Sequence, residues 1–109
     1  MAIERVFIGT DNINVVRVLN DGSPVPFISV TRIVVELLDL GTTLDSSIVN
    51  FVDWSLGDGK LKFYWDEVSG LVTGRVQVRV RVYDPDHDDG QIIVHESDED
   101  PLVFEFLEG

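Results

Sequence analysis

The sequence predicts a single all-β domain over residues 1–109, built as an antiparallel β-sandwich or small barrel of about seven to nine short strands. Valine and isoleucine are abundant, whereas alanine occurs once, at Ala2. Glycines punctuate the chain at short intervals, which is typical of turns between strands. The length of 109 residues is close to the commonest size of one domain, and we find no repeat or linker.

The first half of the chain contains several segments with strand character. We expect the first two strands in "IERVFI" (3–8) and "NVVRVL" (14–19), followed by the polar turn "NDGSPVP" (20–26). The apolar run in "SVTRIVVELLDLG" (29–41) suits either a buried strand or a short helix. Its β-branched residues and flanking turn residues favour a strand. We expect a further strand over 48–54.

The second half of the chain gives the strongest strand signals. "GDGK" (57–60) predicts a tight hairpin turn, because Asp-Gly tolerates positive φ, and "KLKFYW" (60–65) is the returning strand. In "GRVQVRVRVYD" (74–84), valines at alternate positions point to one face, and arginines and a glutamine point to the other. This pattern predicts a half-buried antiparallel strand. "QIIVHE" (91–96) and "PLVFEF" (101–106) complete the set.

The charge balance excludes several classes of partner. Twenty acidic against eight basic residues give a formal charge of -12, and such a surface repels phosphate backbones and anionic lipids. We therefore expect no nucleic-acid partner and no membrane partner. No apolar run approaches the roughly 20 residues of a membrane helix. The start of the chain, "MAIERVFIG", lacks the basic and long apolar stretches of a signal peptide.

No catalytic arrangement is recognisable in the sequence, so we expect no enzyme. The chain has no cysteine, which excludes thiolate chemistry and disulfides. Its two histidines, His87 and His95, lie near acidic turns, and no serine occupies a nucleophile-elbow pattern. No glycine loop has the spacing that cradles a phosphate. We expect no cofactor, with calcium as the one cation to consider.

The stretch "YDPDHDDGQ" (83–91) has the carboxylate spacing with which a calcium loop begins. Its candidate metal ligands are Asp84, Asp86, Asp88 and Asp89. An EF-hand is excluded, because Gly90 is one position too late and the flanks read as strands rather than helices. A nonstandard calcium site, shared with "SDEDP" (97–101), remains as one interpretation. We favour the other, a solvated connection between strands in which Pro85 and Gly90 set the turn.

Three arginines form a strip on one face of the strand over 74–84, and they are candidate interface residues. Arg75, Arg79 and Arg81 stand out in a chain that is otherwise acidic. One interpretation is cross-strand pairing with acids such as Glu36 or Glu105, which we favour because such pairs are common. The other is docking against an acidic surface of another subunit, for which the planar guanidinium is well suited.

Four aromatic residues cluster around the predicted hairpin, and two of them are further interface candidates. The cluster consists of Trp54, Phe63, Tyr64 and Trp65. Alternation places Lys62 and Tyr64 on one face of their strand, with Leu61, Phe63 and Trp65 on the other. We favour a core role for the cluster. If Trp54 or Tyr64 is exposed, it suits an oligomer interface or a sugar-stacking surface.

The order of these landmarks resembles a known family. "VVRVLNDGSPVPFISVTRIVVEL" is followed by "LDSS", "FVDWSLGDGKLKFYW" and "GLVTGRVQVRVRVYDPDHDDG". Over residues 14–95 this is similar to small immunoglobulin-like β-sandwich virion proteins of tailed bacteriophages, including the N-terminal domain of baseplate upper proteins. The chain departs from that pattern in its acid-rich turn, and His95 stands where a tryptophan is expected. No binding residues are therefore carried over.

The resemblance implies an immunoglobulin-like sandwich and a structural role in a phage particle. The protein would be a tail, baseplate, head–tail or capsid-associated component. It would be made in the host cytoplasm, be located in the virion, and contact other virion proteins as a homo- or hetero-oligomer. The alternative function, from a different class, is a carbohydrate- or receptor-binding β-sandwich module, with or without the assistance of calcium.

Overall fold

The fold is given by a computed structural model, which describes residues 2–12, 14–20, 23–55, 57, 59–94 and 101–109. In this part of the chain the regular structure consists of strands and two short 3-10 turns, as the all-β prediction requires. The strands are β1 (Ala2–Ile8), β2 (Asn14–Arg17), β3 (Leu19–Asn20), β4 (Ser23–Pro24), β5 (Arg32–Leu37), β6 (Thr42–Asp45), β7 (Val52–Asp53), β8 (Lys60–Phe63), β9 (Gly74–Asp84), β10 (His87–Val94) and β11 (Leu102–Glu108). The 3-10 turns are η1 (Leu38–Leu40) and η2 (Trp65–Glu67).

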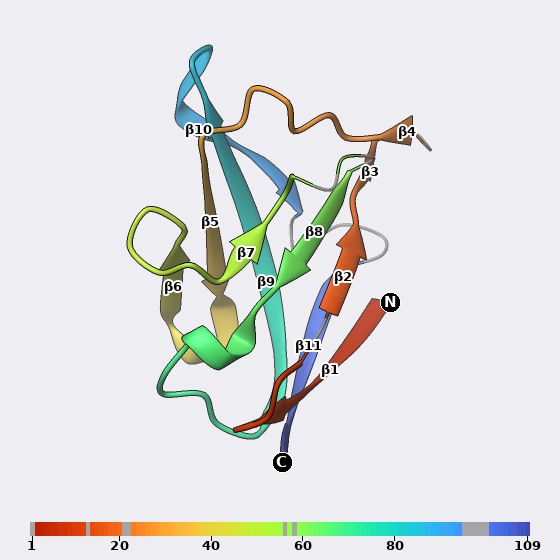
Figure 1. Cartoon of the computed structure of the whole chain (residues 1–109), viewed down its shortest axis with the longest axis vertical. Coiled ribbons are helices and arrows are strands. Elements are labelled where there is room, and N and C mark those ends of the chain that lie inside the picture. The colour runs from red at the N-terminus through yellow and green to blue at the C-terminus, as the bar shows by residue number, and fades with distance from the viewer. Residues whose placement is uncertain (1, 13, 21–22, 56, 58, 95–100) are drawn as a thin grey trace.

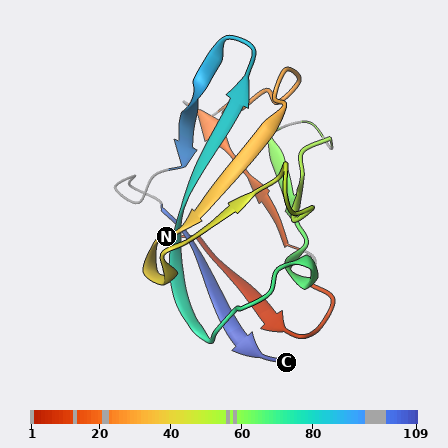
Figure 2. The ribbon, with the colours of Figure 1, turned by 90° about the vertical axis from the view of Figure 1, so that its left-hand side faces the viewer.

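The strands form two layers, an arrangement compatible with a β-sandwich. A six-stranded sheet has the order β1-β11-β9-β5-β6, with β10 also paired to β9. A three-stranded sheet, β2-β8-β7, lies in front of β9 in Figure 1, and β3 and β4 form a small ribbon at one end. Figure 2 shows β10, β9, β5 and β6 side by side in that order. The strand β9 is thus the centre of the larger sheet.

The alternation that predicted β9 is also what places it in the core. Val76, Val78, Val80 and Val82 are all buried, while the residues between them face outward. The prediction of this strand over 74–84 is confirmed at both ends. Its first half pairs with β11 and its second half with both β5 and β10, so one long strand joins most of the sheet.

Aromatic rings fill the space between the two sheets. The predicted inward face of β8 and η2 is confirmed, because Leu61, Phe63 and Trp65 are buried. The Trp65 ring stacks on Phe63 with centroids 5.5 Å apart, and it meets the edges of Phe104 and Phe106 at 4.7 and 5.2 Å. Offset and edge-to-face contacts of this kind stabilise a core beyond the area that they bury.

The prediction of a purely antiparallel sheet is wrong at the chain ends. Strands β1 and β11 pair in parallel, from Ala2 opposite Leu102 to Ile8 opposite Glu108. Parallel neighbours need a long crossover connection, and here the rest of the domain provides it. The alternation of apolar residues indicates which face of a strand is buried, but not whether its neighbour runs parallel or antiparallel. The sequence therefore could not predict this pair.

The prediction of a strand over 48–54 is also wrong for most of its length. Strand pairing occurs instead at β6, before this segment, and in the two residues of β7 at its end. The chain turns between them because the carbonyl of Asp45 accepts the N–H groups of Ile48 and Val49 at 3.0 and 2.9 Å. The Asp45 carboxylate also accepts the N–H of Ser47. A local turn of this kind competes with extended structure.

The remaining strands lie near their predicted positions, with shifted ends. The segment 29–41 forms a strand, β5, but its last part is the 3-10 turn η1. Strand β10 begins four residues earlier than expected, and the predicted positions 95 and 96 lie outside the described residues. Eleven strands lie within the described part of the chain, more than expected, because β3, β4 and β7 contain two residues each. No helix in that part has the length and apolar character needed to cross a membrane.

Candidate functional site

Two of the three arginines in the strip are engaged by acids of neighbouring strands. Arg75 Nε donates to Glu105 Oε2 at 2.9 Å, across the pairing of β9 with β11. Arg79 Nη1 donates to Glu36 Oε2 at 2.9 Å, across the pairing of β9 with β5. The cross-strand pairing that the sequence favoured is therefore present. Exposed pairs of this kind stabilise a fold only modestly, so the strip serves first to hold strands in register.

The third arginine, Arg81, packs along the strand beside it. A Cβ built on Gly90 would lie 2.6 Å from both Cγ and Cδ of Arg81 and 3.0 Å from Tyr83 Cε1. Gly90 has a φ of 81°, in the left-handed region that glycine adopts without strain. It lies where the pairing of β10 with β9 is irregular, between His87 and Gln91. Glycine is thus required here both by the backbone and by the arginine stem.

Substitution of Gly90 by alanine is expected to destabilise the domain more than the same change at Gly70. Gly70 has a nearly identical φ of 79°, but nothing lies within 4 Å of its added Cβ. Both variants carry the cost of a left-handed alanine, about 1 kcal/mol. Only Gly90→Ala must also displace Arg81, which we expect to add about 0.5–1 kcal/mol. Urea unfolding of both variants measures the difference, and equal losses would contradict the packing role of Gly90.

The acid-rich stretch forms a hairpin, with Pro85 and Asp86 as the connection. Strand β10 begins at His87, so Asp88 and Asp89 belong to a strand rather than to a loop. The prediction that Gly90 sets the turn is wrong, because the irregular pairing at Gly90 comes after the turn. Asp84 and Asp86 line one surface groove and Asp88 and Asp89 are not among its lining residues, so the four acids do not converge.

One oxygen of the Asp84 carboxylate is already hydrogen-bonded within this hairpin. His87 Nδ1 lies 2.8 Å from Asp84 Oδ1, and the N–H of Asp86 donates to the same oxygen at 2.9 Å. The His87 contact, followed by the backbone hydrogen bond, holds the pKa of Asp84 below its ordinary value. Within the described residues, no three acidic or histidine side chains gather as a metal site would require. Residues 97–100 of the other acidic segment lie outside the described residues.

Millimolar calcium is expected to leave the thermal midpoint of unfolding unchanged relative to a chelator control. The physical reason is that Asp84 is engaged and that Asp88 and Asp89 lie on a strand, so few oxygens converge. A cation that binds only the folded state raises the midpoint. A reproducible rise that Asp84→Asn abolishes would overturn this expectation and restore the calcium interpretation.

The pairing of His87 with Asp84 is a relationship that the sequence did not reveal. An acid that binds the Nδ1 of a histidine is also found beside catalytic bases, and Ser23 and Ser29 line the same groove. However, among the described residues no hydrogen bond joins either serine to His87. The pair as described closes the end of a hairpin.

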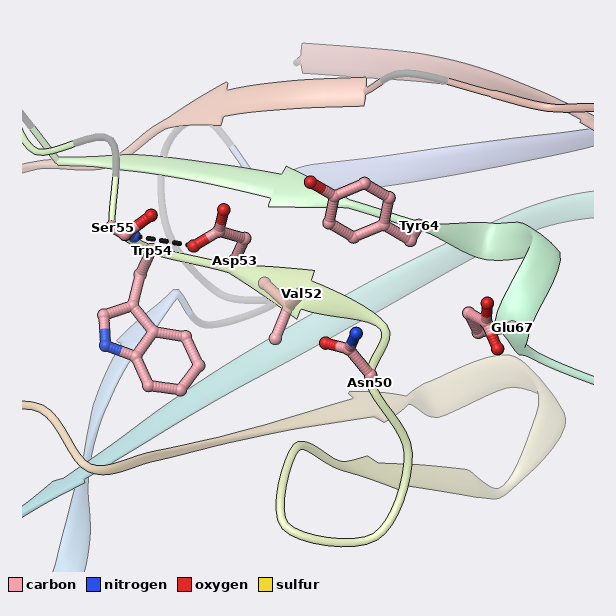
Figure 3. A pocket seen from close by; sticks show the side chains of 7 residues that line it. All are labelled: Asn50, Val52, Asp53, Trp54, Ser55, Tyr64 and Glu67. Carbon is pink, nitrogen blue, oxygen red and sulfur yellow. Dashed lines mark hydrogen bonds between the residues drawn. The ribbon is translucent and has the colours of Figure 1, made fainter.

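Trp54 and Tyr64, the two aromatic interface candidates, come together at one surface pocket. The pocket has a volume of about 600 Å³ and lies at the edge strand β7 of the smaller sheet. Figure 3 shows the two rings with Val52 and Asp53 between them, and with Asn50 and Glu67 at the Tyr64 end. Trp54 and Tyr64 are both partly exposed, unlike the buried Trp65, but Trp54 also packs against the core, so the expected core role of the cluster is confirmed except at Tyr64.

The pocket is built from fixed groups. Trp54 Nε1 donates to the carbonyl of Val30 at 3.1 Å, which orients the indole ring. The Ser55 N–H donates to Asp53 Oδ1 at 2.8 Å, and this bond, with the Ser55 hydroxyl, holds the pKa of Asp53 below its ordinary value. An ionised carboxylate therefore lies in the same pocket as two aromatic rings. Lys62 Nζ lies 5.2 Å from the Tyr64 ring centroid, within the range of a cation–π contact.

Sequence reasoning found the aromatic members of this pocket but missed its polar ones. Asn50, Asp53 and Glu67 read as ordinary surface residues, since an acidic chain offers many equivalent acids. Only Asp53 could have been identified from the sequence as a pocket residue, because alternation puts it on the same outer face as its partner Lys62 in β8.

Comparison of the chain with family models, curated proteins and solved structures gives no match.

Proposed function

We propose that this domain is a structural component of a tailed-phage virion that acts through protein–protein contacts and performs no chemistry of its own. It is made in the host cytoplasm and is incorporated into the particle as a tail, baseplate, head–tail or capsid-associated component. Its partners are other virion proteins, in a homo- or hetero-oligomer, rather than nucleic acid or membrane.

Two observations support this proposal. The first is the order of sequence landmarks over residues 14–95, which resembles immunoglobulin-like virion proteins. The second is the two-layer all-β architecture, which is compatible with the sandwich that such proteins have. The immunoglobulin-like identity of the fold is itself part of the proposal.

The observation that carries the protein–protein role is the set of apolar side chains left exposed on loops and strand edges. Ile28 is 99% exposed and Ile48 is 81% exposed. Leu19, Val72 and Phe7 are also substantially exposed. Single exposed apolar residues are common, but two isoleucines almost fully in water suit burial by a partner.

Mass spectrometry of purified phage particles tests this proposal directly. The chain should be present in density-purified virions of a phage whose genome encodes it, at a reproducible copy number relative to the major capsid protein. Its recovery only in the host lysate, and not in washed particles, would overturn the virion role. A copy number that matches the symmetry of the tail or baseplate would also assign its location.

A carbohydrate-binding role is the second candidate, because the Trp54 and Tyr64 rings share a pocket with an ionised Asp53. Aromatic faces stack on the apolar faces of sugar rings, and carboxylate or amide groups accept and donate hydrogen bonds to hydroxyls. An array of oligosaccharides, followed by titration of Trp fluorescence, tests this role. Tyr64→Ala should weaken a bound sugar by about tenfold or more. Phe7→Ala, a change of an exposed aromatic residue outside this pocket, is the matched control.

A further inference from the structure

Strand β10 is the most open edge of the larger sheet. Within the described part of the chain, β10 pairs with β9 alone, and Figure 2 shows it at one side of the sheet. Asp88, Asp89 and the irregular pairing at Gly90 interrupt its first half. Its second half, Gln91–Val94, pairs with β9 as far as Val80, with a further register shift between Ile92 and Val94. An edge of this kind leaves alternate backbone N–H and C=O groups available to another strand.

The other outer edges of the larger sheet are bonded in part by the chain itself. On β1, the Asn12 side chain bonds both the N–H and the carbonyl of Phe7, at 2.8 and 2.7 Å, and so imitates a neighbouring strand. Asn14 Nδ2 donates to the carbonyl of Arg5 at 3.0 Å. On β6, the carbonyl of Asp45 is taken by the N–H groups of the following turn. Because β1 and β6 are protected in part, and β10 pairs with β9 alone among the described residues, β10 is the candidate docking edge.

A groove runs beside β10 and gives an added strand somewhere to place its side chains. It has a volume of about 620 Å³ and lies between the β9–β10 hairpin and the segment that contains β3 and β4. Its apolar lining includes Leu19, Val25, Val30, Ile92 and Ile93. Leu19 and Ile92 are about half exposed, so apolar surface here is in contact with water. Alternate side chains of a strand on β10 would point into this lining.

The charge of the groove selects the partner. Asp84 and Asp86 lie at its hairpin end, and no lysine or arginine is found among the described residues that line it. The chain as a whole has a net charge of -12. Acidic groups beside an apolar lining complement a segment that carries both aliphatic and basic side chains.

We propose that an extended segment of another virion protein, with alternating aliphatic and basic residues, adds as a strand to the Gln91–Val94 edge of β10. The aliphatic residues occupy the groove, and the basic residues meet the acids at its hairpin end, which are Asp86 and the Asp84 oxygen that His87 does not contact. The identity of the partner as a virion protein rests on the function proposed above, whereas the edge, the groove and the peptide chemistry do not.

Titration of the whole chain with a short synthetic peptide of alternating valine and lysine tests this inference. The expected result is binding with a dissociation constant of about 1 mM or tighter, followed by NMR. The amides of Gln91–Val94 should gain protection from hydrogen exchange, and binding should weaken as salt increases. The same peptide with glutamate in place of lysine should bind at least about tenfold more weakly, because it meets like charge.

A pair of matched variants locates the site. Ile92→Arg places a bulky charge in the groove and should reduce binding by about tenfold or more. Val15→Arg places the same charge at an aliphatic residue of similar exposure on β2 of the smaller sheet, outside the groove, and should leave binding unchanged. Failure of the valine–lysine peptide to bind, equal effects of the two variants, or protection outside β10 would each overturn the inference. Self-association of the chain that Ile92→Arg abolishes would also overturn it, because the occupant would then be a second copy.

These outcomes are separable from those of the proposed function. A chain present in virions that fails to bind the peptide retains the virion role and loses the docking edge. A chain absent from virions that binds the peptide at β10 retains the docking edge with a partner from elsewhere.

Discussion

Replacement of Phe104 by alanine is expected to lower the free energy of unfolding by about 3–5 kcal/mol. The Phe104 side chain is fully buried and meets the Phe63 and Trp65 rings edge to face, at centroid distances of 5.1 and 4.7 Å. Its removal forfeits these contacts and leaves a cavity between the two sheets. Because a domain of this size has a total stability of about 5–15 kcal/mol, the variant should be close to unfolding.

Urea unfolding followed by Trp fluorescence measures this loss, and Phe7→Ala is its control. Phe7 is also a phenylalanine on a strand of the larger sheet, but it is 44% exposed. We expect the control to lose about 1 kcal/mol or less. Comparable losses in the two variants would show that the aromatic cluster is not the main source of stability.

Replacement of Asp45 by asparagine is expected to cost about 2–3 kcal/mol at neutral pH, and the cost should disappear in acid. Arg32 Nε donates to both oxygens of this carboxylate, at 2.9 and 3.1 Å, and Arg32 Nη2 forms an ion pair with Oδ2. Ser47 donates to it through its N–H and its hydroxyl. Asparagine has an NH2 group in place of one of the two carboxylate oxygens, so it can accept only some of these hydrogen bonds.

The direction of the pH dependence follows from the pKa of Asp45. The hydrogen bonds from Arg32, followed by those from Ser47, hold this pKa below its ordinary value of 3.8 against the opposing effect of burial. A carboxyl group whose pKa is lower in the folded state than in the unfolded state stabilises the fold fully at pH values above the unfolded-state pKa. This contribution decreases as the pH falls from the unfolded-state pKa through the folded-state pKa. The difference between the native chain and Asp45→Asn should therefore be constant above about pH 5 and shrink below about pH 4.

Denaturant unfolding at a series of pH values checks this prediction, with Asp66→Asn as the control. Asp66 is an exposed acid in η2, and its substitution should have little effect at any pH. A cost of Asp45→Asn that stays the same down to pH 3 would contradict the role of the ionised carboxylate. The Arg32 guanidinium also lies 4.6 Å from the Tyr83 ring centroid, so the pair links β5, β6 and β9 on one face.

The candidate site was only partly predictable. Trp54 and Tyr64 were interface candidates on condition that they were exposed, and the structure brings both partly exposed rings to one pocket, while their use as an interface stays a prediction. Asn50 and Glu67 join them only because the loop before β7 and the turn η2 after β8 meet there.

The acids of 84–89 are a case in which residues close in sequence do not form a site. They are adjacent in sequence, but a two-residue turn and an irregular strand pairing disperse them.

The sequence by itself determined the all-β class, the strand β9 with its buried valines, and the inward face of β8. Each of these follows from a period of two in hydrophobicity, which is a local property of the chain. Only the tertiary structure decided the parallel pairing of β1 with β11, the early strand β6, and the closed and open edges of the larger sheet. These depend on which distant segments become neighbours, and local periodicity specifies the buried face of a strand without specifying its partner.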